Sequence, residues 1–341
     1  MQIPRKKPGA GVVPSSERIL AVATGAWSAG ILSAAIQHHL FTHLEHGVCV
    51  AAEVANRADL SLRGAQALLD GLVAMGLVIN RDGEYLNSPE SSAFLVEGRP
   101  GYLGAYIRLE GMSMEQWALM PEAVQSGAPS ETGPGLFPPT FLAELAQALI
   151  PLSYPVARVA AEQLGIAGAG PLSLLDVGGG SGIFSAVFLH ENAEARATQI
   201  DAALVNRMAR EVVAAHGIEP ARFVTLDGDF HLIDLGSELH DVVIYSHMAQ
   251  SAAPEANRHT FRRIHQALKP GGVLAIVDMV LDDQRTGHPL ALLYNANMFM
   301  RTVGGGTYTR GQYRRWLESA GFREVRFIPT EGPATLVMAD S

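Results

Sequence analysis

The sequence has a single cysteine, a shortage of basic residues and no long apolar run. Cys49 has no second cysteine to pair with, so nothing indicates an oxidising compartment, and we expect a cytoplasmic protein. The sequence has 25 Lys and Arg residues but 34 Asp and Glu residues. The resulting formal net charge of −9 argues against nucleic acid or anionic membranes as partners. No run of about 18 apolar residues occurs, so we expect no membrane span.

The chain is long enough for two domains, because 48% of its 341 residues are hydrophobic and can fill more than one core. The basic, Pro- and Gly-rich start lacks the apolar core of a signal peptide, so residues 1–15 are expected to form a flexible arm. We expect a mostly helical domain over 16–125 and a linker with helices over 126–170. Residues 171–341 are expected to form an α/β domain.

The first domain is expected to be a winged helix. Helical spacing of apolar residues up to the C-cap Gly47 is followed by a helix, a turn, a second helix and a hairpin at "NRDGEY". The second helix carries only Arg63 as a cation, so a packing or dimerisation module is favoured over a DNA reader. His39, His43 and His46 have the spacing of one helix face, but no carboxylate or cysteine completes a metal site, and none is expected.

The second domain alternates apolar runs with helical patterns, which is typical of a parallel sheet covered on both faces. Ligands of such sheets bind at the carboxyl ends of the strands. The expected strands are "LSLLDVG", "ARATQID", "RFVTLDGD", "DVVIYS", "GGVLAIVDMV" and "EVRFIPT".

A glycine loop, "DVGGGSG", follows the first of these strands and opens a helix. Gly178, Gly180 and Gly182 allow the backbone to approach a ligand, but their spacing differs from the G-x-G-x-x-G of dinucleotide folds. Asp201 ends the next strand, where its carboxylate would meet ribose hydroxyls. Asp229 and Phe230 end the third, beside an adenine. These positions favour S-adenosylmethionine as the cofactor.

In combination and order, "DVGGGSG", "DGDF", "ALKPGG" and "VDMVLDD" resemble the class I methyltransferases of the plant caffeic acid and bacterial antibiotic O-methyltransferase type. The resemblance implies a Rossmann-like domain that binds S-adenosylmethionine and releases S-adenosylhomocysteine. It also implies a homodimer held by the winged-helix domain and a small acceptor, often aromatic, bordered by the helices of 126–170. The residues expected to contact the cofactor are Asp176, Gly178, Gly180, Asp201, Asp229, Phe230 and Ser246.

The resemblance also places an unusual residue at the catalytic position. The histidine that takes the acceptor's proton in the plant-type enzymes corresponds to Gln250, whose amide cannot accept that proton. The two carboxylates that support this histidine correspond to Asp278 and Thr307. A phenol ionises near pKa ~10, so transfer to its oxygen at neutral pH benefits from a base.

Three explanations remain open. His247 takes over as the base, or one of Tyr294, Tyr308 and His288 does. Alternatively the nucleophile is a carbon or an ionised group that needs mainly in-line positioning. We favour C-methylation slightly, because "QSAAPEAN" followed by "DMVLDD" resembles the bacteriochlorophyll ring C-methyltransferase. In the third explanation, the protein binds the cofactor without transferring its methyl group, or is a winged-helix regulator.

The acceptor pocket is expected to be rich in methionine and aromatic side chains, which fit around flat apolar ligands. Asn295 lies where relatives place an acceptor-side Asp. The residues expected to line the pocket are Met112, Trp117, Tyr294, Asn295, Met298 and Phe299.

Overall fold

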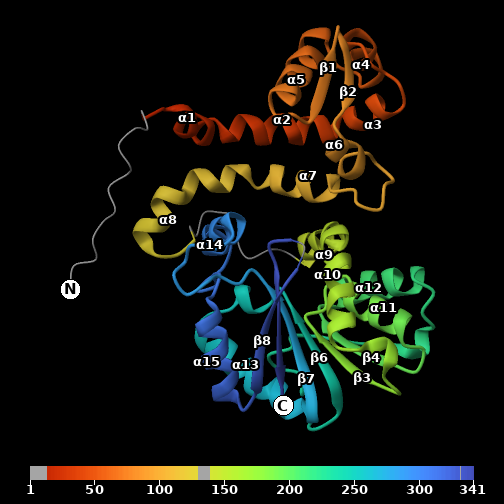
Figure 1. Ribbon diagram of the computed structural model, residues 1–341, viewed down its shortest axis with the longest axis vertical. Coiled ribbons are helices and arrows are strands. Elements are labelled where there is room, and N and C mark those ends of the chain that lie inside the picture. Colours follow the sequence, from red (N-terminus) through yellow and green to blue (C-terminus); the bar gives the residue numbers. More distant parts are fainter. Residues whose placement is uncertain (1–13, 130–138, 331) are drawn as a thin grey trace. The chain divides into compact units, whose positions relative to one another are not determined.

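The computed structural model describes residues 14–129, 139–330 and 332–341 (Figure 1). The chain divides into two compact units, Met1–Met114 and Glu115–Ser341. This division lies before residue 125, where the sequence analysis places the end of the first domain. Residues 1–13 of the expected arm and residues 130–138 of the expected linker lie outside the described residues.

The first unit is helical with one small hairpin (Figure 1). Its elements are α1 (Glu17–Ala23), α2 (Gly25–Gln37), α3 (Leu40–Glu45), α4 (Ala51–Arg57), α5 (Leu62–Ala74), β1 (Val78–Arg81), β2 (Glu84–Asn87), α6 (Pro89–Phe94) and α7 (Gly104–Met112). The hairpin expected from "NRDGEY" is confirmed: β1 and β2 pair antiparallel around Asp82 and Gly83, which both have positive φ. The α4–α5 pair and this hairpin give the winged-helix order.

His39, His43 and His46 do not lie on one continuous helix, although their spacing in the sequence is that of one helix face. The helix breaks at His39, which has a left-handed φ of 53° between α2 and α3. The imidazole of His39 instead lies 3.0 Å from Glu97. Within the described residues, no group of three or more His, Cys, Asp or Glu side chains is arranged to hold a metal ion.

The second unit surrounds a seven-stranded sheet of order β5-β4-β3-β6-β7-β9-β8. Its strands are β3 (Ser173–Val177), β4 (Arg196–Asp201), β5 (Phe223–Asp227), β6 (His240–Ser246), β7 (Leu268–Asp278), β8 (Arg323–Pro329) and β9 (Thr335–Asp340). The expectation of a wholly parallel sheet is wrong at one edge. There β9, which the sequence analysis missed, pairs antiparallel with β7 and β8. A connection of five residues between β8 and β9 is too short for a parallel crossover.

Helices cover both faces of this sheet. The helices after α7 are η1 (Met114–Leu119), α8 (Met120–Ser126), α9 (Pro139–Ala148), α10 (Ile150–Gln163), η2 (Ile166–Gly168), α11 (Ile183–Glu191), α12 (Ala203–Ala215), η3 (Pro220–Arg222), η4 (Ala249–Ser251), α13 (Pro254–Ala267), α14 (Pro289–Arg301) and α15 (Arg310–Ala320). Successive strand residues point to opposite faces. Leu174 and Ile244 therefore pack with α10, α11 and α12, whereas Leu175 and Tyr245 pack with α13 and α15 (Figure 1).

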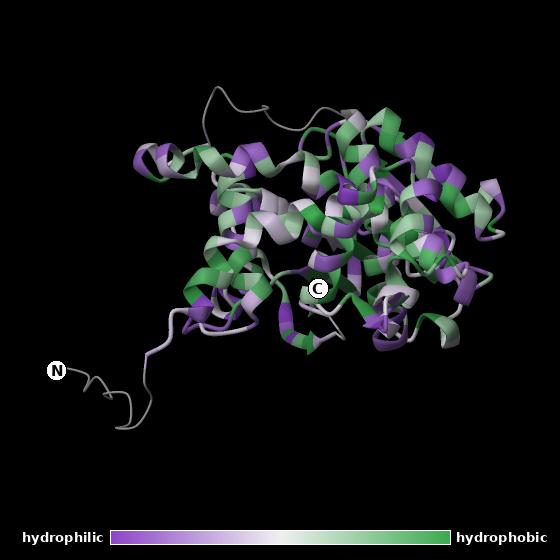
Figure 2. Ribbon diagram, turned by 90° about the horizontal axis from the view of Figure 1, so that it is seen from above, coloured by the Kyte–Doolittle hydropathy of each residue, from purple (hydrophilic) through white to green (hydrophobic). Residues whose placement is uncertain are grey.

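The helices carry hydrophilic and hydrophobic residues side by side, as expected when one face packs on a core and the other meets solvent (Figure 2). Among the described residues, no single helix is long and apolar enough to cross a bilayer. Only α1 and α2 taken together, bent by 51° at their junction, meet that test of length and composition.

Candidate active site

The glycine loop lies between β3 and α11, where the sequence predicted it. Gly178, Gly180 and Gly182 all have positive φ, at 66°, 56° and 73°, which a side chain rarely tolerates. A Cβ at Gly178 would also lie 2.8 Å from the side chain of Met248. The backbone thus favours glycine at all three positions, and at Gly178 the surroundings exclude a Cβ as well.

Asp201 lies directly beside this loop, at the carboxyl end of β4. Its Oδ2 accepts a hydrogen bond of 2.9 Å from the Gly180 amide, and its Oδ1 accepts one of 2.7 Å from Ala202. Burial raises the pKa of Asp201, against the opposing effect of these two amides. The carboxylate is therefore held in a fixed orientation at the loop.

Asp229 and Phe230 follow β5, the neighbouring strand. Asp229 is exposed, and its Oδ1 accepts a hydrogen bond of 2.8 Å from the His231 amide. The Phe230 ring is half-buried and lies edge-on to Tyr245, with ring centroids 6.1 Å apart. The two expected adenine contacts therefore stand at the same edge of the sheet as Asp201, since β4 and β5 are parallel neighbours.

Asp176 and Ser246 come from the central strands β3 and β6. Asp176 has no exposed surface, and burial raises its pKa to about 7. Ser185 donates to its Oδ2 at 2.9 Å, whereas its Oδ1 has no hydrogen-bond partner among the described residues. Ser246 is half-buried. A glycine-rich loop, two acidic strand ends and a buried carboxylate together fit a cofactor with ribose hydroxyls and amino groups.

Gln250 lies in the turn η4 after β6 and joins four segments. Its backbone N–H donates to Asp278 Oδ2 at 3.1 Å, and its backbone carbonyl accepts from the Gly306 N–H at 2.8 Å. Its side-chain Nε2 lies 3.3 Å from the Tyr294 hydroxyl. Gln250 is 2% exposed, so it anchors β7, α14 and the loop after α14 to the end of β6.

His247 directly follows β6 in a strained conformation. Its φ of 58° is unusual for a residue with a side chain, and its amide bonds the Val277 carbonyl at 2.7 Å. Its Nδ1 lies 3.4 Å from Gln250 Nε2 and 4.0 Å from Asp278 Oδ1. Burial lowers the pKa of His247 to about 4, so the imidazole is neutral at pH 7 although 30% of the side chain is exposed.

Asp278 ends β7 and is completely buried. Burial raises its pKa to about 7, against the stabilising hydrogen bonds from Tyr313 Oη, at 2.7 Å, and from Gln250. Oδ1 of Asp278 has no hydrogen-bond partner among the described residues. The resemblance implied that this carboxyl would support a histidine at position 250. In the structure it accepts a hydrogen bond from the backbone amide of Gln250 and faces His247.

On the expected acceptor side, Tyr294 and Asn295 of α14 lie beside the Gln250 turn. Asn295 Oδ1 accepts a hydrogen bond of 3.0 Å from the amide of Thr307, a residue that is 1% exposed. The other pocket residues differ in exposure: Met298 is buried, Phe299 is half-buried, and Trp117 is 38% exposed. Met112 is 76% exposed and belongs to the other compact unit.

Sequence reasoning missed Tyr313 and Gly306, which reach Asp278 and Gln250 from distant parts of the chain. No local pattern marks Tyr313. Gly306 belongs to the run "GGGT", and a Cβ at its neighbour Gly305 would lie 2.6 Å from the Gln250 carbonyl. A run of glycines beside a predicted acceptor helix was the signal that could have found this contact.

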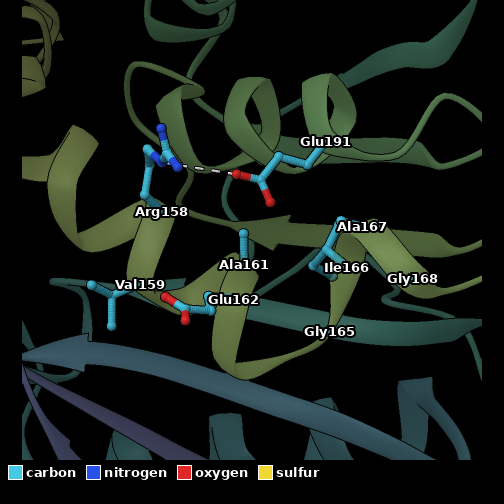
Figure 3. Close-up of a pocket in the computed structure, with 9 residues that line it drawn as sticks. All are labelled: Arg158, Val159, Ala161, Glu162, Gly165, Ile166, Ala167, Gly168 and Glu191. Atoms are coloured by element: carbon cyan, nitrogen blue, oxygen red, sulfur yellow. Dashed lines mark ion pairs between the residues drawn. The ribbon is translucent and has the colours of Figure 1, made fainter.

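A separate pocket of about 330 Å³ lies between the end of α10, η2 and α11 (Figure 3). Arg158 points toward Glu191 across it, with Nε and Oε1 3.9 Å apart. None of the residues predicted for the cofactor, for catalysis or for the acceptor lines this pocket.

The fold and this site define a class I methyltransferase, and comparisons with known proteins agree. Residues 158–323 match the model of the O-methyltransferase domain, and residues 20–97 match that of the O-methyltransferase dimerisation domain. The chain belongs to this family of S-adenosylmethionine-dependent enzymes.

Three known proteins illustrate the kinship. The chain is 32% identical to the 3-hydroxy-5-methyl-1-naphthoate 3-O-methyltransferase of Streptomyces sahachiroi, over 92% of this chain and 91% of that one. It is 32% identical to the tetracenomycin polyketide synthesis 8-O-methyl transferase TcmO of Streptomyces glaucescens, over 94% and 95%. Its fold matches human N-acetylserotonin methyltransferase in complex with SAM at a TM-score of 0.83 and 24% identity, over 98% of this chain and 99% of that one.

Proposed function

We propose that this protein transfers the methyl group of S-adenosylmethionine to a hydroxyl of a fused-ring aromatic metabolite. Both relatives at 32% identity are O-methyltransferases, one of a hydroxynaphthoate and one of tetracenomycin polyketide synthesis. The observation that carries the proposal is the cluster of His247, Asp278, Gln250 and Tyr294 at the end of β6. This cluster offers hydrogen-bonding groups and a neutral imidazole beside the cofactor strands.

The cofactor end of the site uses the chain's own groups in three places. The glycine loop lets the backbone approach the methionine part, Asp201 accepts from the ribose hydroxyls, and Asp229 accepts from the adenine amino group. Bound S-adenosylmethionine supplies an electrophilic methyl group on its sulfonium. The chain must then hold the acceptor oxygen in line with that group, which is worth several kcal/mol as effective molarity.

His247 is the residue we assign as the base. Its imidazole is neutral at pH 7 because its pKa is lowered, so it is ready to accept the acceptor's proton. The imidazolium formed would lie 4.0 Å from Oδ1 of Asp278, whose negative charge stabilises it. Gln250 Nε2 and Tyr294 Oη, 3.3 Å apart, would orient the acceptor hydroxyl.

C-methylation, which the sequence analysis favoured, is the second candidate. A base whose pKa is lowered to about 4 is weak, and the amide of Gln250 cannot help. A carbon nucleophile activated by an adjacent phenolate needs less assistance from the protein. Because both relatives at 32% identity are O-methyltransferases, we rank oxygen ahead of carbon as the methylated atom.

We further propose that the protein is a homodimer through its first unit, because residues 20–97 match a dimerisation domain. Several large apolar side chains of α1 and α2 are exposed in the single chain, among them Val22 at 77% and Trp27 at 71%. A second copy would bury them.

The proposal is tested by incubating the protein with S-adenosylmethionine and a panel of hydroxylated naphthoates and larger fused-ring phenols. Mass spectrometry should show one added methyl group on at least one member, with equimolar S-adenosylhomocysteine. The absence of any methylated product, in a preparation that binds S-adenosylhomocysteine by calorimetry, would support cofactor binding without transfer instead.

A further inference from the structure

Two side-chain amides are buried next to the glycine loop and the ends of β4 and β5, and no sequence motif indicated either of them. Gln199 is on β4, two residues before Asp201, and Asn206 is on α12. Neither side chain has any exposed surface. A buried amide must form hydrogen bonds to be tolerated, so its partners show what it holds in place.

Gln199 holds the glycine loop. Its Nε2 donates to the Gly180 carbonyl at 3.2 Å and to Asn206 Oδ1 at 3.1 Å. A Cβ at Gly179 would lie 2.5 Å from Gln199 Oε1, so the loop closes directly onto this side chain. Gln199 also pairs with Asp176 in the β3–β4 register.

Asn206 holds the ends of the next two strands. Its Nδ2 shares its hydrogens among the Asp201 carbonyl at 3.0 Å, the Leu226 carbonyl at 3.0 Å and Asp227 Oδ1 at 2.8 Å. Asp201 ends β4, and Asp227 ends β5 two residues before Asp229. The Gln199–Asn206 pair therefore connects the glycine loop to the strand ends expected to meet ribose and adenine.

We propose that Gln199 and Asn206 are positioning residues for the cofactor, which fix the spacing between the glycine loop and the ends of β4 and β5. One rigid cofactor must meet all three segments at once, so a change in their spacing weakens every contact together. The inference rests on the cofactor positions proposed above, and it concerns affinity for the cofactor rather than the identity of the acceptor.

A purely structural role is the competing explanation, and the pair itself argues against it. Gln199 Oε1 is buried without a hydrogen-bond partner among the described residues. An unpaired buried acceptor disfavours folding, and an apolar side chain of the same length would avoid that cost. Gln199→Met also removes the hydrogen bonds from Nε2 to the Gly180 carbonyl and to Asn206 Oδ1, which offsets this gain in part. We therefore expect Gln199→Met to lower the thermal stability of the protein less than Asn206→Leu does, while it loosens the loop.

The test measures binding of S-adenosylhomocysteine by calorimetry in Gln199→Met, Asn206→Leu and a control, Asn192→Leu. Asn192 is buried at 5% exposure, and its Nδ2 donates to three carbonyls: Ile166, Ala169 and Gly170. It is thus matched to Asn206 in burial and bonding, but it lies beyond the other end of α11 from the glycine loop. Binding of this probe requires no acceptor, so failure of the proposed acceptor would leave the result readable.

We expect Kd to rise by about tenfold or more in Gln199→Met and Asn206→Leu, as when partners behind other ligand-binding residues are removed. The Asn192 control should lose thermal stability but keep its Kd within about twofold. In hydrogen exchange of the cofactor-free protein, the peptide covering 178–182 should exchange faster in Gln199→Met than in wild type. With an active acceptor, KM for S-adenosylmethionine should rise while kcat at saturation is preserved.

Unchanged Kd together with lowered thermal stability in both variants would overturn the proposal, because the pair would then only support the fold. Equal weakening of binding in the Asn192 control would overturn it as well. Should Asn206→Leu fail to fold, Gln199→Met alone decides between these outcomes.

Discussion

Asp278 is a carboxyl group without exposed surface, and three tyrosines lie around it. Tyr313 donates to it, while the nearby Asp278 charge raises the pKa of Tyr245 and Tyr308, after burial itself. Such a residue is held by its surroundings in a state that costs stability. A buried carboxyl with a raised pKa at the carboxyl end of a strand marks a candidate functional site.

Asp278→Asn should change how stability depends on pH. An aspartate in the unfolded chain ionises near pKa ~3.9, whereas burial raises the pKa of Asp278 in the folded protein to about 7. Between these values the folded state keeps a proton that the unfolded state has released, so stability falls as pH rises from about 4 to about 7. At ~1.36 kcal/mol per pKa unit, the loss above pH 7 is on the order of 4 kcal/mol.

Urea unfolding at pH 5 and pH 8 measures this effect. The asparagine variant should lose less stability between the two values than wild type does. Asp176 contributes a slope of the same sign in both proteins, because its pKa is also raised to about 7, so the difference between them isolates Asp278. Parallel behaviour of the two proteins would show that Asp278 is ionised throughout.

His247→Ala should lower kcat by about 10² or more, the usual contribution of a general base. The rate of this variant should recover as pH approaches ~10, since a phenol acceptor then ionises without help. The pH–rate profile with a phenolic acceptor makes the measurement, with the exposed His190→Ala as control. A rise in KM for S-adenosylmethionine at unchanged kcat would instead indicate that His247 lines the cofactor site and is not the base.

Residue-scale expectations from sequence were accurate where a local pattern existed. The positions of the three glycines and of Asp201 follow from a strand, a turn and a helix in succession. The environment of Gln250 could not be predicted, because Gly306 and Tyr294 reach it from segments more than 40 residues away. The spacing of the three histidines wrongly indicated a single helix face for a related reason. His39 has a left-handed backbone conformation and separates α2 from α3.

At the scale of elements, we propose that the turn between β3 and α11 controls the affinity for the cofactor. Gly178→Ala adds a Cβ 2.8 Å from Met248 as well as a left-handed strain. We expect weaker binding of S-adenosylhomocysteine by at least about tenfold, or 1.4 kcal/mol. Calorimetry on this variant, and on Gly178→Ala combined with Met248→Ala, separates the clash from the strain.

Gly217→Ala is the matched control for this turn. Its φ is 76°, and a Cβ there would meet nothing within 4 Å. It should lower stability by about 1–2 kcal/mol through the left-handed conformation alone and leave cofactor affinity unchanged. Equal affinity of the Gly178 and Gly217 variants would contradict the role given to the glycine loop.

The sheet shows which elements the sequence could predict. The six expected strands are present, because apolar runs separated by helical patterns indicate the strands of a sheet that is covered on both faces. The antiparallel β9 was missed although "TLVMAD" is as apolar as the others. Its direction depends on a short return from β8 and on the free edge of β7, and neither is visible in local spacing.

At the scale of the whole molecule, the first unit should hold two chains together. We expect sedimentation to show a dimer, because the exposed apolar side chains of α1 and α2 would otherwise meet water. Val22→Asp combined with Trp27→Glu should shift the protein toward monomer. Leu232→Glu is the control, since Leu232 is 84% exposed in the other unit. A wild-type monomer, or equal dissociation of the control, would contradict a dimer built on α1 and α2.

The composition of the whole chain argued against nucleic acid and anionic membranes as partners, and its motifs predicted the cofactor. Neither determined which acceptor atom is methylated. We propose that His247, Gln250 and Tyr294 make this choice, and our proposal of oxygen follows the two O-methyltransferase relatives. The sequence favoured carbon because Gln250 is not a base. The structure adds a neutral imidazole with a positive φ that faces a buried carboxyl, and our proposal of oxygen methylation assigns this imidazole as the base.

The most direct test of oxygen methylation supplies S-adenosylmethionine labelled with ¹³C in its methyl group, together with a hydroxylated naphthoate that the enzyme turns over. NMR of the purified product then identifies the atom that carries the label. We predict a methoxy carbon, coupled through oxygen to the ring. A labelled methyl carbon bonded directly to a ring carbon would contradict the account.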